Sequence, residues 1–152
     1  MTHDHHDHDH HDHDHHDHDH DHGHDRQFYG VIPVFLVDDV VATAEYYRDV
    51  LGFEVDFIYG EPATYASVSR DDAIINLSRS EPPGRRNSVS TLSAGNGVDA
   101  YIVVSDIDDV YEEVVSHGAR TTMAPADQDY GMREFLIEDM NGYRLLLGED
   151  IE

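Results

Sequence analysis

The sequence predicts an α+β domain made of two tandem modules, each running strand, helix and three strands. The first observation is a continuous apolar run over residues 29–37, followed by helical spacing and then by three strand candidates. The second is that the same order of elements restarts after a connector over residues 79–97 that is rich in Pro, Gly and Ser. The third is that Val37-Asp38-Asp39-Val40 matches Val104-Ser105-Asp106-Ile107, which indicates an internal repeat.

The first module begins with a strand over Tyr29–Val37, whose β-branched and aromatic residues predict burial on both faces. Pro33 has no N–H for a ladder bond, so this strand should lie at a sheet edge or begin irregularly. A helix should follow Asp38-Asp39, with its apolar face at Val40, Ala44, Tyr47 and Leu51 and its end at Gly52. Three strands are predicted next, with a turn at Asp71-Asp72: Phe53–Tyr59, Tyr65–Ser69 and Ala73–Ser78.

The second module repeats this order. A strand is predicted over Ala100–Val104, followed by a helix that places Ile107, Tyr111, Val114 and Val115 on one face and ends at Gly118. Asn141-Gly142 is a strong two-residue hairpin signal. The remaining predicted strands are Arg120–Met123, Arg133–Ile137 and Tyr143–Leu147.

The first 25 residues form a His/Asp-rich tail that is predicted to be disordered, because 13 His and nine Asp leave no apolar surface to bury. Neutral imidazole and carboxylate groups suit Zn, Ni, Co or Cu ions, so the tail is a candidate metal site. A native metal-buffering segment, an engineered purification tag and a functionally silent extension all fit this pattern. The candidate ligands are His3, His5, His6, His8, His10, His11, His13, His15, His16, His18, His20, His22 and His24.

The rest of the chain is strongly acidic. Nine of the 33 acidic residues lie in the tail and all nine basic residues lie outside it, so residues 26–152 carry a formal net charge of −15, without Lys. Such a surface repels nucleic acid and anionic membranes. Either adaptation to high salt (a halophilic protein) or a cationic ligand explains it. The chain has no Cys and no apolar run long enough for a membrane span, which favours a cytoplasmic protein.

Several segments resemble the vicinal oxygen chelate superfamily, which includes glyoxalase, extradiol dioxygenase and bleomycin resistance proteins. They are VDDV and AEYYRDVLGF in the first module, and GMREFLIEDMNG and YRLLLGE in the second. With Ile32-Pro33-Val34 and Asp99-Ala100-Tyr101, they are most similar to the bleomycin-resistance branch. The resemblance implies cupped mixed sheets, one domain over residues 26–152 with modules at about 28–80 and 97–149, and a homodimer.

The metal ligands of enzymes in this superfamily would fall at Ile32, Asn76, Asp99 and Leu146. Ile and Leu offer no lone pair, so two oxygens remain, too few for a divalent ion. The one His outside the tail, His117, fits a helix end better than a metal site. We therefore expect no metal or other cofactor in the core and no catalytic residue, and lean against an enzyme.

The strand face that carries these four positions should form an apolar pocket for an organic molecule. Its predicted ligand-binding residues are Val34, Leu36, Asn76, Asp99, Tyr101 and Arg144, with Tyr130 and Arg133 as a clamp for an aromatic ligand. The leading hypothesis is non-catalytic sequestration of an antibiotic-type molecule, which would confer antibiotic resistance. The alternatives are a metal-dependent lyase or dioxygenase, and divalent-metal buffering by the tail.

Overall fold

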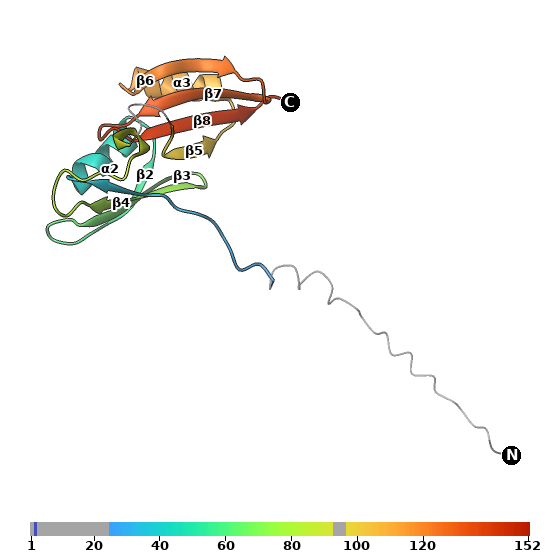
Figure 1. Ribbon diagram of the computed structural model, residues 1–152. Coiled ribbons are helices and arrows are strands. Elements are labelled where there is room, and N and C mark those ends of the chain that lie inside the picture. The colour runs from blue at the N-terminus through green and yellow to red at the C-terminus, as the bar shows by residue number, and fades with distance from the viewer. Residues whose placement is uncertain (1, 3–24, 93–96) are drawn as a thin grey trace. The chain divides into compact units, whose positions relative to one another are not determined.

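The computed structural model describes Thr2, residues 25–92 and residues 97–152, and its compact unit spans Ile32–Glu152. This unit contains two modules, called module 1 and module 2 (Figure 1). The elements of module 1 are β1 (Val34–Val37), α2 (Val40–Asp49), β2 (Glu54–Tyr59), β3 (Tyr65–Arg70) and β4 (Ala73–Arg79). The elements of module 2 are β5 (Ala100–Val103), α3 (Ile107–Ser116), β6 (Arg120–Asp127), β7 (Met132–Glu138) and β8 (Arg144–Asp150).

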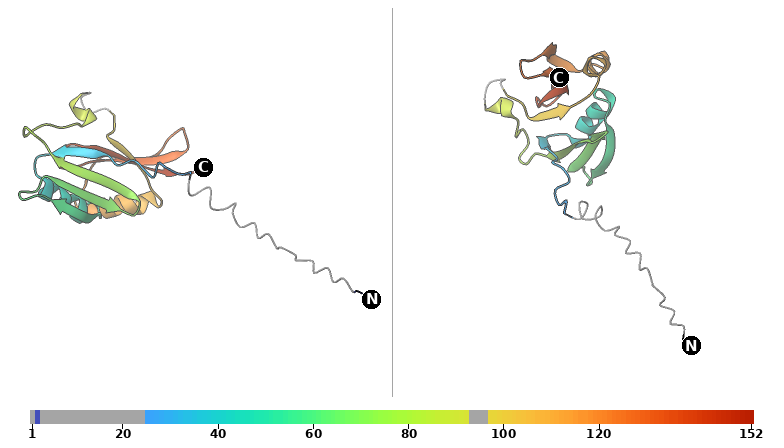
Figure 2. Two further views of the ribbon diagram at one scale, coloured as in Figure 1. Left: turned by 90° about the horizontal axis from the view of Figure 1, so that it is seen from below. Right: turned by 90° about the vertical axis from the view of Figure 1, so that its right-hand side faces the viewer.

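Each module forms one mixed four-stranded sheet, so the predicted fold class is confirmed. The strand orders are β1-β4-β3-β2 and β5-β8-β7-β6, which are the same pattern used twice. In each sheet the first strand pairs parallel with the last, and the other pairs are antiparallel. Both views in Figure 2 place the two helices on the same side of the strands. A short 3-10 turn, η2 (Val89–Thr91), lies in the connector.

The first strand is shorter than predicted. β1 starts at Val34 instead of Tyr29, and Phe28, Tyr29 and Val31 are exposed. The prediction of burial on both faces is therefore wrong for this stretch. Pro33 explains the start, because its nitrogen cannot donate to the ladder, although its carbonyl still accepts from Asn76 N at 3.0 Å. The edge position predicted for this strand is confirmed.

The two helices begin with different caps. Asp39 caps α2 as predicted, because its carboxylate accepts from Ala42 N at 2.9 Å. The equivalent residue in α3, Asp106, has a φ of 53° and makes no side-chain cap. Glu149 on β8 replaces it by accepting from Asp106 N at 2.6 Å and from Ile107 N at 3.3 Å. The second helix is therefore fastened to its sheet by a residue distant in sequence. Neither helix in the described ranges has the length and apolar character that a membrane crossing requires.

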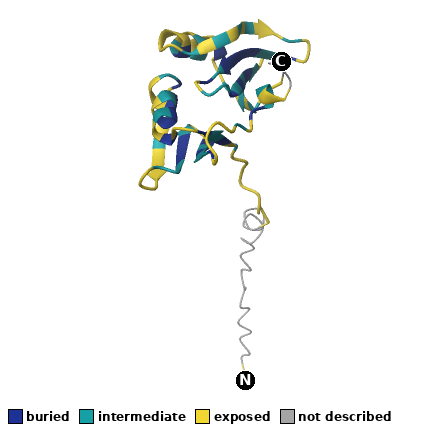
Figure 3. Ribbon diagram, turned by 60° about the vertical axis from the view of Figure 1, so that its left-hand side comes forward, coloured by how far each residue is buried: buried dark blue, intermediate teal, exposed yellow. Residues whose placement is uncertain are grey.

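The helix-facing sides of both sheets share one hydrophobic core. Buried side chains from the two modules form a single cluster. Figure 3 colours the buried residues dark blue, and they occur along the strands and α2. Phe35 of β1 stacks on Tyr143, which directly precedes β8, with ring centroids 4.2 Å apart. Tyr47 of α2 donates its hydroxyl to Asp139 of the β7–β8 turn at 2.7 Å. Burial raises the pKa of this carboxyl. Because these contacts join the modules, they set how the two sheets are placed in one chain.

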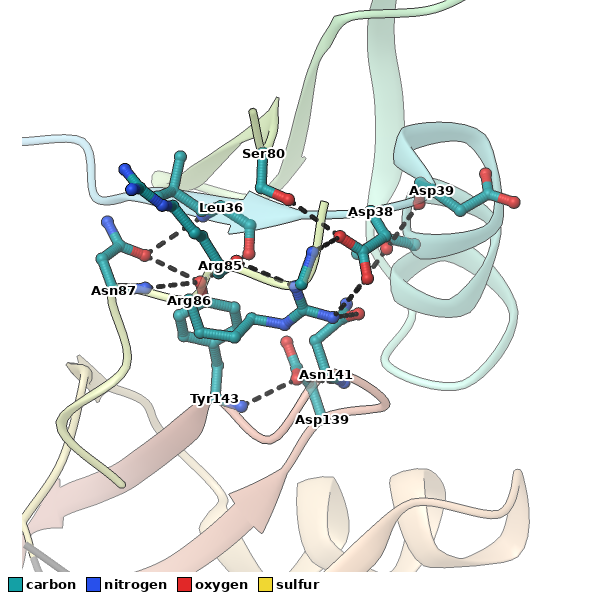
Figure 4. A network of polar contacts seen from close by, with 12 residues as sticks. Leu36, Asp38, Asp39, Ser80, Arg85, Arg86, Asn87, Asp139, Asn141 and Tyr143 are labelled. Atoms are coloured by element: carbon teal, nitrogen blue, oxygen red, sulfur yellow. Dashed lines mark hydrogen bonds and ion pairs between the residues drawn. The ribbon is translucent and has the colours of Figure 1, made fainter. Parts of the chain in front are cut away.

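The connector holds the free edge of β1 (Figure 4). The Asn87 side chain donates to Val34 O at 2.9 Å and accepts from Leu36 N at 3.1 Å, as a neighbouring strand would. Tyr143 donates its hydroxyl to Leu36 O at 2.6 Å. Asp38 accepts from Arg86, Gly84 N and Ser80, and the Arg86 hydrogen bond holds its pKa well below the usual range. An edge that would otherwise be open to pairing is therefore covered by the chain itself.

Candidate functional site

The candidate site is the side of each sheet that faces away from the helices, called here the open face. Strand alternation assigns residues to it, because their neighbours in sequence belong to the core cluster. Phe35, Val37, Leu145 and Leu147 are buried in that cluster. The open face of module 1 carries Val34, Leu36, Tyr65, Ser67, Ile74 and Asn76, and that of module 2 carries Tyr101, Val103, Glu134, Leu136, Arg144 and Leu146.

The open face of module 1 combines exposed apolar groups with one unsatisfied acceptor. Val34 and Ile74 are 38% and 36% exposed, although both lie within paired strands. Between them, Asn76 donates its amide to Tyr65 Oη at 3.2 Å. Its Oδ1 is buried and has no partner among the described residues. A buried carbonyl without a donor costs about 1–3 kcal/mol. Because this oxygen is closed to solvent, a ligand that donates an N–H or O–H to it must first displace the side chains that cover it.

The open face of module 2 centres on a buried carboxylate. Glu134 is 2% exposed and accepts from the hydroxyls of Tyr101, at 2.5 Å, and Tyr130. Gly148 makes this possible, because a Cβ there would lie 2.1 Å from Tyr101 Oη. Desolvation and then the Glu134 hydrogen bond raise the pKa of Tyr101 to about 12, and the same carboxylate raises the pKa of Tyr130. Both phenols are therefore protonated at neutral pH and act as hydrogen-bonding groups, not as bases.

Two predicted polar groups are engaged with the connector. Asp99 accepts from Val89 N at 2.6 Å, from the Ser88 hydroxyl at 2.8 Å and from Arg144 N at 2.8 Å. The Arg144 side chain donates to Gly97 O at 2.8 Å. These contacts order the chain that leads into β5. Ligand binding by Asp99 and Arg144 stays a prediction, and it would require sharing or breaking these bonds.

The structure does not bring Tyr130 and Arg133 together as a clamp. Arg133 alternates in step with Phe135 and Ile137, the core residues of β7, and so lies on the helix side of the sheet. There it donates to Asp108 at 3.0 Å and to Asp127 at 2.9 Å. Tyr130 instead donates to Glu134 on the open face. The two side chains have different partners on opposite sides of the sheet. Glu134 is the residue that sequence reasoning missed, and its signal was an acid alternating with Leu136 inside an apolar strand.

The residues at the superfamily's ligand positions do not fit a metal ion. Ile32 and Leu146 have no donor atom, and the Asp99 carboxylate already accepts three hydrogen bonds. Asn76 Oδ1 is the one free oxygen of this set within the described residues. In the same ranges no cluster of three His, Cys, Asp or Glu side chains occurs, and His117 lies at the end of α3. The tail His residues from His3 to His24 lie outside the described residues.

Comparison with known proteins gives one family and many similar folds. The model of the Glyoxalase/Bleomycin resistance protein/Dioxygenase superfamily matches residues 32–147. The bleomycin-binding protein from bleomycin-producing Streptomyces verticillus, solved with copper(II)-bleomycin, is 29% identical, with a TM-score of 0.61 over 80% of this chain and 96% of that one. Two further structures show the fold.

The first is the bleomycin resistance determinant encoded on the transposon Tn5, which is 21% identical with a TM-score of 0.64, over 81% of this chain and 98% of that one. The second is a glyoxalase-related enzyme from Clostridium phytofermentans, 20% identical with a TM-score of 0.65, over 83% of this chain and 98% of that one. Among curated proteins, none matches this chain. The family model covers most of the chain and the whole of both modules except the end of β8, so the chain belongs to the Glyoxalase/Bleomycin resistance protein/Dioxygenase superfamily.

Proposed function

We propose that this protein binds and sequesters a small organic molecule of the bleomycin type in the cytoplasm, without transforming it. The observation that carries the proposal is the open face of module 1, where exposed Val34 and Ile74 flank the unsatisfied Oδ1 of Asn76. Apolar surface with a few fixed polar groups is typical of sites that recognise organic molecules. A ligand that displaces the side chains covering this oxygen would supply the missing donor by presenting an N–H or O–H to it.

The polar groups of module 2 support binding over chemistry. Tyr101 and Tyr130 are fixed by Glu134, and their raised pKa values keep both phenols neutral at physiological pH. Tyr101 is 42% exposed and Tyr130 63% exposed, so their rings remain available for stacking while their hydroxyls are held. A rigid aromatic surface suits a planar heteroaromatic group. No nucleophile with an activating base is assigned to either open face.

The similarity to a bleomycin-binding protein supports this ligand class. That protein is 29% identical and covers 80% of this chain. Bleomycin-type glycopeptides are cationic, and the formal charge of −15 on residues 26–152 would speed their capture. We propose a homodimer in which a second copy covers the open faces, because exposed apolar strands of this kind need a ligand, a partner chain or both.

The test is calorimetric titration of the full chain with metal-free bleomycin in high salt, with a chelator present to keep metal ions off the tail. We expect saturable binding near one molecule per chain. Val34→Gln should weaken it, because it places an amide on the open face. Val41→Gln is the matched control, since Val41 has the same 38% exposure but lies on α2.

The proposal would be refuted if bleomycin gave no heat of binding with the unmodified chain. It would also be refuted if Val34→Gln and Val41→Gln lost the same affinity for bleomycin. Light scattering on the same samples measures the mass, which should be twice the 17.2 kDa of one chain. A monomeric mass at binding concentrations would refute the dimer while leaving the ligand class standing.

A second function is favoured by one sequence observation, the tail of 13 His and nine Asp. We propose that it binds divalent Zn, Ni, Co or Cu in several weak sites. Titration with Zn²⁺ of the full chain, and of a chain lacking residues 1–25, separates the two functions. Metal uptake that survives the deletion would place the metal elsewhere. Loss of metal uptake together with unchanged bleomycin binding would show that the functions are independent.

A further inference from the structure

A cavity of about 480 Å³ lies where the two modules meet, and we call it the junction cavity. One side is the β3–β4 hairpin of module 1, and the other is the end of β5 and the start of α3 in module 2. Its floor is apolar and includes Leu51, Phe53, Ile102 and Leu147. None of the eight residues predicted from sequence to bind a ligand lines it. The volume lies within the range of about 300–1,000 Å³ that is usual for small-molecule sites.

The rim of the junction cavity is acidic and not neutralised. Arg70 is the one basic side chain among the described lining residues. Its guanidinium is already engaged, donating to both oxygens of Glu113 at 2.7 and 3.0 Å and to Leu51 O at 2.9 Å. The remaining rim carboxylates have no hydrogen bond or ion pair within the part of the chain that the structure describes. They are Asp71, Asp72, Asp106 and Asp109.

These carboxylates come from both modules and border one apolar floor. A concave surface with low-dielectric walls and one sign of charge concentrates the field at its mouth, which attracts counter-ions of the opposite sign. An inorganic cation would leave the apolar floor wet, and an apolar molecule would leave the carboxylates without a partner. The occupant that satisfies both is a molecule with a cationic head and an apolar body.

We propose that the junction cavity binds amphipathic organic cations, with a protonated amine or similar cationic group at the acidic rim and an apolar body on the floor. This site is separate from the open faces and does not depend on the function proposed for them. Its selectivity follows from the geometry: amines should bind better than alcohols of the same shape, and carboxylic acids should be rejected.

The experiment uses 4-phenylbutylamine as the probe and 4-phenylbutanol as its uncharged counterpart, titrated into the full chain near pH 7.5 while amide chemical shifts are recorded. The amine is protonated there because its pKa is close to that of Lys, about 10.4. We expect the amine to bind at least about tenfold more tightly than the alcohol. The shifts should centre on the β3–β4 hairpin and the first turn of α3. Tetramethylammonium, which lacks an apolar body, should cause no saturable shift.

Two double variants test the role of the rim. Asp72→Asn with Asp109→Asn should weaken amine binding roughly five- to tenfold. Glu112→Gln with Asp129→Asn removes the same charge from exposed positions outside the cavity and should change binding less than about twofold. Val34→Gln on the open face should leave amine binding unchanged.

Equal affinity for the amine and the alcohol would overturn the proposal, as would equal losses in the two double variants. Shifts centred on the open face or the tail would overturn it too, because the amine would then be following the general acidity of the chain. Thermal unfolding of each variant without probe shows whether it is folded. A destabilised rim variant is replaced by Asp72→Asn alone, for which a loss of roughly two- to fourfold is expected.

Discussion

Removing the Tyr47 hydroxyl should loosen the junction between the modules. In the native chain Tyr47 is fully buried, Asp139 is 5% exposed, and the hydroxyl donates to Oδ2 of the carboxylate at 2.7 Å. The other carboxylate oxygen accepts from Asn141 N at 2.8 Å and Tyr143 N at 2.9 Å. Tyr47→Phe therefore leaves Oδ2 buried without its donor. A hydrogen bond to a charged group is worth about 1.5–3 kcal/mol, so we expect the free energy of unfolding to fall by about 2 kcal/mol.

The pH dependence of this loss has a definite sign. Burial raises the pKa of Asp139 in the folded state, so its favourable contribution is present at low pH and is lost as pH rises through the folded pKa. The Tyr47 hydrogen bond opposes that rise by stabilising the carboxylate. Removing the Tyr47 hydroxyl raises the free energy of the ionised Asp139 carboxylate further. The deficit of Tyr47→Phe should therefore be smaller near pH 4 than near pH 7, because a larger fraction of Asp139 is ionised at the higher pH.

Urea unfolding at the two pH values measures the effect, and Tyr46→Phe is the control. Tyr46 precedes Tyr47 on the same helix and is partly buried, but its hydroxyl makes no hydrogen bond within the described residues. We expect its loss to cost less than about 0.5 kcal/mol. If the two variants lost the same free energy, or if the deficit of Tyr47→Phe were independent of pH, the reasoning from the buried carboxylate would be refuted.

Three further outcomes are expected. Asn87→Ala removes the side chain that pairs with the β1 edge, so stability should fall by about 1–3 kcal/mol and hydrogen exchange at the Leu36 amide should accelerate. Gly148→Ala places a Cβ against Tyr101 Oη, so the tyrosine ring must move away from Glu134. The pKa of Tyr101 should then fall from about 12 toward its ordinary value, which absorbance titration measures. Zn²⁺ binding by the full chain should be measurable near pH 7.5 and largely lost near pH 5, since His protonates near pH 6.5. Each prediction has its own contrary result. These are an unchanged exchange rate at the Leu36 amide, an unchanged pKa of Tyr101, and Zn²⁺ binding that does not depend on pH.

Periodicity and turn chemistry were sufficient to predict the elements and their repeat. Gly52 adopts a φ of 75° three residues after the end of α2, as a helix stop should. Gly142 has a φ of 88° in the hairpin between β7 and β8, but this connection spans residues 139–143 and is longer than the predicted two-residue turn. These signals are local, because the backbone conformation depends on the residue itself. The wrongly predicted strand start at Tyr29 has a different cause. Apolar residues predict burial, but they cannot show whether a neighbouring strand is present to bury them.

The composition of the open faces was predictable, but the state of their polar groups was not. The family resemblance placed Asn76 and Asp99 on one face, and alternation along the strand added Tyr101 to it. Which of them is free to meet a ligand depends on partners contributed from elsewhere: Asp99 is saturated by the connector and by β8, whereas Asn76 Oδ1 is not. A strand pattern contains no information on such contacts. An acid at an equivalent register position is therefore weak evidence for a site until its hydrogen bonds are counted, and an amide that lacks a donor is the stronger indication of where a ligand binds.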